Sequence, residues 1–123
     1  MFTDRLAEAE QWFRKALMAF QATKDVPGMA RTLYNLANLL ADDPARLDEA
    51  RSLAEEALTI KEALDNAALA IWKTYELLAR IADQQGDSSQ AAEYRAKSRQ
   101  AYLAFPGWRQ GLYQHEPLIA AVV

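Results

Sequence analysis

Leu33-Tyr34-Asn35-Leu36-Ala37 carries the pattern from which the fold is predicted, and Ala54-Glu55-Glu56-Ala57-Leu58 follows it in the chain. In a helix, the apolar side chains of the first stretch form one stripe at the i, i+3, i+4, i+7 spacing: Leu33, Leu36, Ala37 and Leu40. The second stretch belongs to a similar stripe: Leu47, Ala50, Ala54, Ala57 and Leu58. Both stripes alternate bulky with small side chains, and alanine lets two helix backbones approach closely. The two stretches are therefore predicted to pair as one antiparallel helical hairpin.

The same pattern recurs along the chain. Leu36 and Leu78 are 42 residues apart, as are Ala37 and Ala79. Gly86-Asp87 then repeats the turn before another apolar stripe. Upstream, four apolar residues anticipate the second helix of the hairpin by 41 residues: Ala9, Phe13, Ala16 and Leu17. Recurrence at such a period is typical of helical-hairpin repeats.

The composition is that of a globular all-α chain. With 123 residues, 51% of them hydrophobic and 25% charged, the chain is long enough for one domain with a modest core. The net charge of −3 disfavours nucleic acid as a partner. The absence of cysteine excludes disulfides and thiolate metal sites and fits a cytoplasmic location. Acidic and basic residues near the N-terminus exclude the apolar core of a signal peptide, and no apolar run reaches membrane-spanning length.

Turn and capping residues divide the chain into helices. Pro27 fits the first turn of a helix ending near residue 41, and Asp43 can cap a short turn before a helix over 47–64. Gly86 can end the next helix, and Asp87 can cap the one after it. We predict a single domain over 1–123, in four parts: the second helix of a partial repeat (5–24), two repeats (27–64 and 66–105), and a C-terminal helical cap (108–123).

The stripes also predict the core. Six large side chains are expected to be mostly buried: Leu33, Leu36, Leu40, Leu58, Tyr75 and Leu78. Ala37 and Ala79 are expected at helix–helix contacts. The three tryptophans are interpreted as inter-helix packing residues, with a place on a binding surface as the alternative: Trp12, Trp72 and Trp108.

These residues resemble a known family. The run Leu-Tyr-Asn-Leu-Ala at 33–37, the later Ala50 and the segment 56–62 look like tetratricopeptide repeats, most of all the longer repeats of the kinesin light chain and of bacterial scaffold proteins. The resemblance implies antiparallel hairpins stacked as a short right-handed superhelix. It also implies a module that binds a peptide or partner protein in a concave groove, and no enzyme.

The resemblance places the groove on the first helix of each repeat. On the first such helix the lining residues are Arg31, Tyr34, Asn35, Asn38 and Ala41, and on the second Lys73, Glu76, Leu77, Arg80 and Asp83. Asparagine amides offer both a donor and an acceptor to an extended peptide, and the basic residues suit an acidic partner. Asn35, Asn38 and Lys73 match positions of the clamp with which the family binds a terminal carboxylate. Tyr34 and Leu77 stand where that clamp has basic residues, which argues against a terminal carboxylate as the ligand. Each set is also explained by a solvated helix face.

Other chemistry has little support. His115 is the only histidine, and no nucleophile–base–orienter set accompanies it, so we expect no catalytic, metal or cofactor site. Residues 37–65 hold eight acids and three bases, and 88–115 hold one acid and four bases, which suggests two charged poles. The apolar residues near Phe2 and Trp12 and in 118–123 predict self-association, as a two-fold dimer. The alternative function is a structural or regulatory segment of a larger multidomain bacterial protein.

Overall fold

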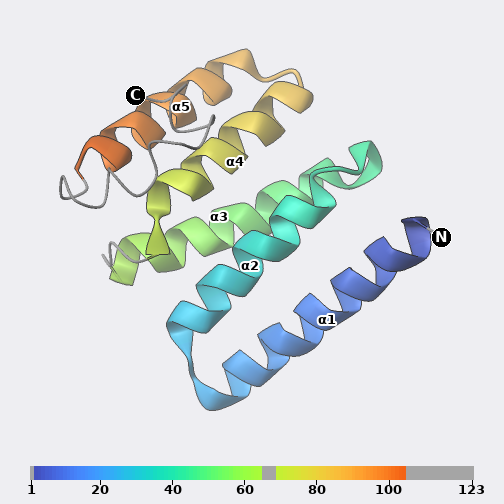
Figure 1. The fold of residues 1–123 in the computed structure, drawn as a ribbon. Coiled ribbons are helices and arrows are strands. Elements are labelled where there is room, and N and C mark those ends of the chain that lie inside the picture. Colours follow the sequence, from blue (N-terminus) through green and yellow to red (C-terminus); the bar gives the residue numbers. More distant parts are fainter. Residues whose placement is uncertain (1, 65–68, 105–123) are drawn as a thin grey trace. The chain divides into compact units, whose positions relative to one another are not determined.

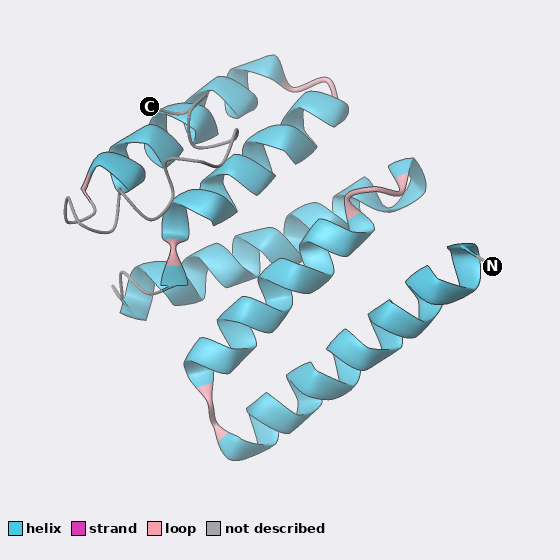
Figure 2. Cartoon of the chain, in the orientation of Figure 1, coloured by secondary structure: helices cyan, strands magenta, loops and turns pink. Residues whose placement is uncertain are grey.

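The described part of the chain is entirely helical. The computed structural model describes residues 2–64 and 69–104, and it contains no strand within those ranges (Figures 1 and 2). Its elements are α1 (Phe2–Thr23), α2 (Val26–Leu40), the 3₁₀ helix η1 (Pro44–Arg46), α3 (Leu47–Leu64), α4 (Ile71–Gln84) and α5 (Ser88–Leu103). The all-α prediction is confirmed. The predicted cap over 108–123, with Trp108, lies outside the described residues.

The chain divides into two compact units, residues 1–69 and 70–123. The division falls close to the predicted boundary between the two repeats. Unit 1 holds α1, α2, η1 and α3, and unit 2 holds α4 and α5. The stacking of the repeats into a superhelix stays a prediction, and each unit is described below by itself.

In unit 1, α2 packs against both α1 and α3. The apolar stripe of α2 is buried as predicted: Leu33, Leu36, Ala37 and Leu40 are all at most 3% exposed. The facing stripe of α3 consists of alanines that are fully buried: Ala50, Ala54 and Ala57. Leu58 was expected in the core but is only half-buried. It adjoins Ala57 in the chain, and the three alanines occupy the middle of the face that α3 buries.

Aspartate side chains cap α2 and η1 in unit 1. The carboxylate of Asp25 accepts a hydrogen bond from the backbone N–H of Gly28 at 3.0 Å, which satisfies one of the donors left unpaired at the start of α2. Pro27 lies in the first turn of α2, as expected. The carboxylate of Asp43 accepts from the N–H of Ala45 at 2.9 Å and starts η1.

Gly28 allows α1 and α2 to meet closely at their turn. A Cβ atom at this position would lie 2.7 Å from Cδ1 of Phe20 and 2.9 Å from the Asp25 carboxylate. We expect Gly28→Ala to lower the free energy of unfolding by ~1 kcal/mol, because overpacking costs more than alanine's better helix propensity returns. Urea denaturation would measure the change. The combined variant with Phe20→Leu relieves the clash and should recover part of the loss, whereas an unchanged or raised stability for Gly28→Ala contradicts the close contact.

In unit 2, α4 and α5 form a hairpin around a buried tryptophan. Trp72 is fully buried, and its ring meets that of Tyr102 edge-to-face with centroids 5.5 Å apart. The hydroxyl of Ser98 donates to the carbonyl oxygen of Trp72 at 2.8 Å. The packing role predicted for Trp72 is confirmed, as is the burial of Leu78 and Ala79.

Two other predictions about aromatic residues need correction. Tyr75 is half-buried rather than buried, and its ring lies beside that of Tyr94 with centroids 6.5 Å apart. Trp12 is 72% exposed on α1 and packs between no helices; the ammonium of Lys15 lies 5.7 Å from its ring. The interpretation of Trp12 as an inter-helix residue was therefore wrong.

Capping between α4 and α5 follows the sequence. Gly86 has φ +80°, a left-handed conformation that glycine adopts without strain. The backbone N–H of Asp87 donates to the carbonyl of Ala82 at 2.8 Å and closes the end of α4. The Asp87 carboxylate then accepts from the N–H of Gln90 at 3.2 Å and begins α5.

Candidate functional site

The predicted groove residues of α2 form a polar face opposite its buried stripe. Arg31, Asn35 and Asn38 are exposed, at spacings of three and four residues that place them on one side of the helix. Ala41 is 2% exposed, so it belongs to the core and not to this surface. The face therefore consists of one guanidinium and two amides.

Tyr34 is half-buried beside this face. The ammonium of Lys61, from α3, lies 4.7 Å from the centre of its ring. Lys61 is itself only 4% exposed. A cation at this distance is attracted by the ring face, and the attraction is stronger where water is excluded. Tyr34 thus holds a structural contact between α2 and α3 as well as bordering the polar face.

The predicted groove residues of α4 are less uniform. Arg80 and Asp83 are exposed, and Asp83 forms an ion pair with Arg95 of α5. Lys73 and Glu76 are half-buried, and the pKa of Glu76 is raised by burial although Arg95 and Arg80 oppose that shift. Half-burial leaves these two side chains less surface for a partner than Arg80 has.

Leu77 does not lie on the surface that the sequence predicted. It is 4% exposed and is part of the wide apolar arc of α4. The buried residues of that arc are Trp72, Thr74, Leu77, Leu78, Ala79, Ile81 and Ala82. An arc of this width also buries positions on either side of the single stripe that the sequence pattern suggested. Leu77 is one of these buried positions, so it is not available to contact a partner.

A four-residue ion network ties α1 to the start of α3. The guanidinium of Arg46 donates to both carboxylate oxygens of Glu10, at 2.5 and 2.8 Å, and to Glu49. Arg14 donates to Glu10 at 2.9 Å and to Glu49 at 2.7 Å. Each carboxylate therefore has two arginine partners, and the pKa of Glu10 is lowered from 4.5 to about 2, mainly by its hydrogen bonds to Arg46.

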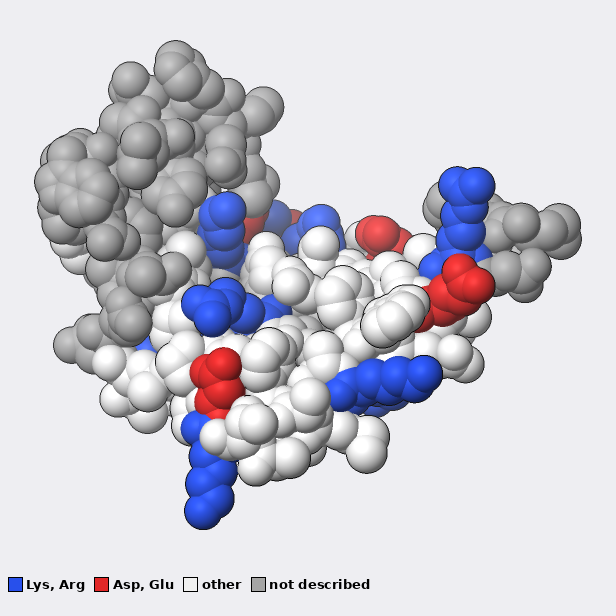
Figure 3. All heavy atoms as spheres, turned by 60° about the horizontal axis from the view of Figure 1, so that its bottom comes forward, with Lys and Arg blue, Asp and Glu red and all other residues white. Residues whose placement is uncertain are grey.

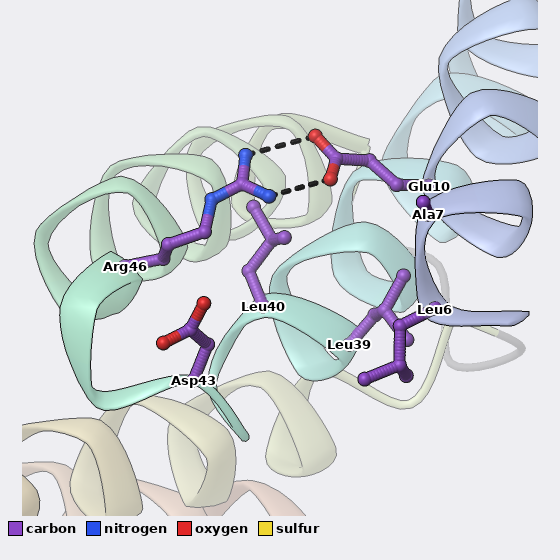
Figure 4. A pocket seen from close by; sticks show the side chains of 7 residues that line it. All are labelled: Leu6, Ala7, Glu10, Leu39, Leu40, Asp43 and Arg46. Atoms are coloured by element: carbon purple, nitrogen blue, oxygen red, sulfur yellow. Dashed lines mark hydrogen bonds and ion pairs between the residues drawn. The ribbon is translucent and has the colours of Figure 1, made fainter. Parts of the chain in front are cut away.

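A pocket lies beside this network (Figure 4). Its volume is about 190 Å³, and it opens between the N-terminal half of α1 and the corner where α2 gives way to η1. Its lining consists of Leu6, Ala7, Glu10, Leu39, Leu40, Asp43 and Arg46. Leu6 and Leu39 are half-buried and Ala7 is exposed, so the pocket is open to solvent. An apolar floor with a charged wall is suited to a side chain, since it offers both burial and orientation.

Charged side chains of both signs are mixed on one face of the molecule. Figure 3 shows one face of the molecule, where basic and acidic side chains are interspersed with uncharged ones and gather into no single patch. Among the described residues, no three His, Cys, Asp or Glu side chains come together as a metal site.

Comparison with known proteins places this helical architecture in a family. The model of the family described as tetratricopeptide repeat matches residues 1–63, just over half of the chain. The chain belongs to the tetratricopeptide repeat family. No curated protein and no solved structure matches it. Tetratricopeptide repeats generally mediate protein–protein interaction and are typically non-catalytic. In the part of this tetratricopeptide repeat chain that the structure describes, no helix is both long and apolar enough to span a membrane.

The ion network and the pocket were missed by the sequence analysis. Two of the ion pairs could have been predicted from local spacing. Glu10 and Arg14 are four residues apart, and Arg46 and Glu49 are three apart, which are the spacings of paired side chains on a helix surface. The bond from Arg46 to Glu10 spans 36 residues of sequence and appears only once α1 and α2 pack together. The pocket depends on the same packing.

The network predicts a pH dependence of stability. The folded-state pKa of Glu10, about 2, is below its usual 4.5, so its contribution is present at neutral pH and is lost as pH falls from about 4.5 toward 2. We expect Glu10→Gln to lower the free energy of unfolding by about 1 kcal/mol at neutral pH, because the pairs are partly exposed. Thermal melts at a series of pH values would show the difference from wild type shrinking below pH of about 4. Glu56→Gln, at an exposed position on α3, is the matched control and should show no such convergence.

Proposed function

We propose that the chain is a protein–protein interaction module whose groove binds an extended peptide or a segment of a partner protein. The observation that carries this proposal is the polar face of α2, where Arg31, Asn35 and Asn38 are exposed along one side of a helix whose other side is core. Amides arranged in a row can pair with the N–H and C=O groups of an extended backbone, because each amide offers a donor and an acceptor.

The basic residues of the proposed groove favour an acidic partner. Arg31 on α2 and Arg80 on α4 are exposed, and Lys73 is half-buried. Guanidinium groups bind carboxylates through charge-assisted hydrogen bonds. The α2 face and the α4 face belong to different units, and each is proposed by itself as a partner-binding surface.

Site-specific crosslinking would test the proposal directly. The chain has no cysteine, so a single introduced thiol can carry a photo-crosslinker without competing reactions. With the crosslinker at Asn35→Cys, we expect capture of acidic peptides from a random peptide library, and much less capture of basic ones. Ser52→Cys, exposed on α3, is the control. Equal capture from both positions, or none from position 35, contradicts a groove on α2.

Asn38 provides a binding prediction. For a peptide selected in this way, Asn38→Ala should weaken binding by ~0.5–1.5 kcal/mol, the worth of one hydrogen bond, and by more if the partner group is charged. Titration calorimetry would measure the loss. The residue is exposed and off the core stripe, so its replacement should leave the melting temperature unchanged, which separates a binding effect from an unfolding effect.

The alternative is a structural or regulatory segment of a larger, cytoplasmic bacterial protein with longer, kinesin-light-chain-like repeats. The 42-residue recurrence supports the longer repeat type. The exposure of Trp12 and Met18, 72% and 67%, supports a further contact on α1. We include self-association in this proposal, since a second copy is one way to cover exposed apolar surface. A chain that self-associates but binds no peptide would favour this alternative over the peptide-binding groove.

A further inference from the structure

The pocket between α1 and the α2–η1 corner of unit 1 combines an apolar floor with a charged wall. Its floor is formed by Leu6, Leu39 and Leu40, and Leu6 and Leu39 are still partly open to water. Covering them with another apolar side chain is favourable in proportion to the area removed from water.

The wall of the pocket selects the charge of the occupant. Glu10 and Arg46 are paired with each other, so their charges largely cancel. Asp43 also lines the pocket and is exposed, and Asp42 beside it is exposed as well. Residues 37–65 as a whole carry five more acids than bases. An apolar side chain accompanied by a cation therefore matches this corner best.

The chain itself carries such a combination on α5. Leu103 is 51% exposed, and Arg99 precedes it by four residues and is also exposed, so both lie on one face of the helix. The same face continues toward the N-terminus of α5 with the small, exposed Ala96 and Ala92, which permit close approach of another surface. Residues 88–115 carry three more bases than acids.

We propose that the pocket of one copy receives Leu103 of a second copy, with Arg99 of that copy placed against Asp43. This inference rests on the self-association proposed above and names the two surfaces through which the copies would associate. The two surfaces are different, so the contact is heterologous, and one copy can accept at its pocket while it donates its α5. The expected assembly is built from head-to-tail contacts between two different surfaces, in place of a two-fold contact of one surface with itself.

Two substitutions at exposed positions separate the surfaces. Ala7→Arg fills the pocket and adds a cation that repels Arg99 of the second copy. The α5 helix of the substituted chain stays intact. Leu103→Asp removes the anchor and leaves the pocket intact. In sedimentation velocity over a wide dilution series, we expect wild type to form concentration-dependent oligomers and each variant alone to associate at least roughly tenfold more weakly. Ala22→Arg, exposed on α1 away from the pocket, should behave as wild type.

Mixing the two variants gives the decisive result. The α5 of the Ala7→Arg chain can still dock in the pocket of the Leu103→Asp chain, so an equal mixture should form dimers that grow no further. A two-fold contact of either surface with itself predicts no such rescue. A mixture that stays monomeric, a variant that associates as wild type does, or a wild type that is monomeric throughout would overturn the proposal.

A double-mutant cycle between Arg99 and Asp43 distinguishes loss of the contact from misfolding of a variant. Arg99→Glu and Asp43→Asn should each weaken association, and asparagine keeps the capping acceptor at position 43. If the two groups meet, Asp43→Asn should cost much less in the Arg99→Glu background than in wild type. Additive effects would overturn the pairing. Peptide capture at position 35 is independent of these variants, so failure here and failure of the groove can be told apart.

Discussion

Replacing Trp72 by alanine should lower the free energy of unfolding by ~3–5 kcal/mol, the largest effect we expect from any single substitution. The side chain is fully buried, and its ring packs edge-to-face on Tyr102. Ala70 and Ala101 pack around the same pair, and such small side chains have little reach with which to fill the space that the ring leaves. The loss thus combines the lost apolar burial with a residual cavity.

Urea denaturation followed by far-ultraviolet circular dichroism would measure this loss. Trp12→Ala is the matched control: the same residue change at a side chain that is 72% exposed should alter stability by no more than about 0.5 kcal/mol. Trp72→Phe keeps an aromatic ring for Tyr102 and should cost less than Trp72→Ala. If Trp12→Ala and Trp72→Ala lowered the free energy of unfolding by similar amounts, the burial of Trp72 would not be what stabilises unit 2.

The contrast between these two tryptophans shows that the sequence pattern alone does not predict which side chains are buried. Both are aromatic residues in helices with apolar neighbours at helical spacing, so the pattern assigned both to packing. Burial depends on which helix covers the position, and α5 supplies Tyr102 to Trp72. Local signals were more reliable: Asp43 and Gly86 mark helix ends through interactions within a few residues of each position, and both were predicted.

In the candidate site, too, the features set by local spacing could be predicted from the sequence, and those set by long-range packing could not. The polar face of α2 was readable because spacing alone puts Arg31, Asn35 and Asn38 together. Leu77 was misplaced because α4 buries a wider arc than one stripe. The pocket beside Glu10 and Arg46 was not readable, since it joins residues that are 36 positions apart. Long-range contacts of this kind require the helix packing to be known first.

Ala37→Leu should cost ~1–3 kcal/mol, for the opposite physical reason to Trp72→Ala. Ala37 lies on the stripe that α2 buries and is fully buried, as are Ala50, Ala54 and Ala57 on α3, which packs against α2. Alanines on the packed face set a short distance between the two helices. A leucine at position 37 has no space to occupy, so it forces the helices apart or its side chain into a strained rotamer.

The matched control for this substitution is Ala22→Leu, the same change at an exposed position of α1. Alanine and leucine have similar helix propensities, so a difference between the two variants reports packing alone. Chemical denaturation should give a large loss for Ala37→Leu and almost none for Ala22→Leu. If α2 and α3 were held apart by larger side chains, leucine at position 37 would instead add apolar burial and raise the free energy of unfolding. The sign of the change therefore decides whether the repeat depends on close alanine packing.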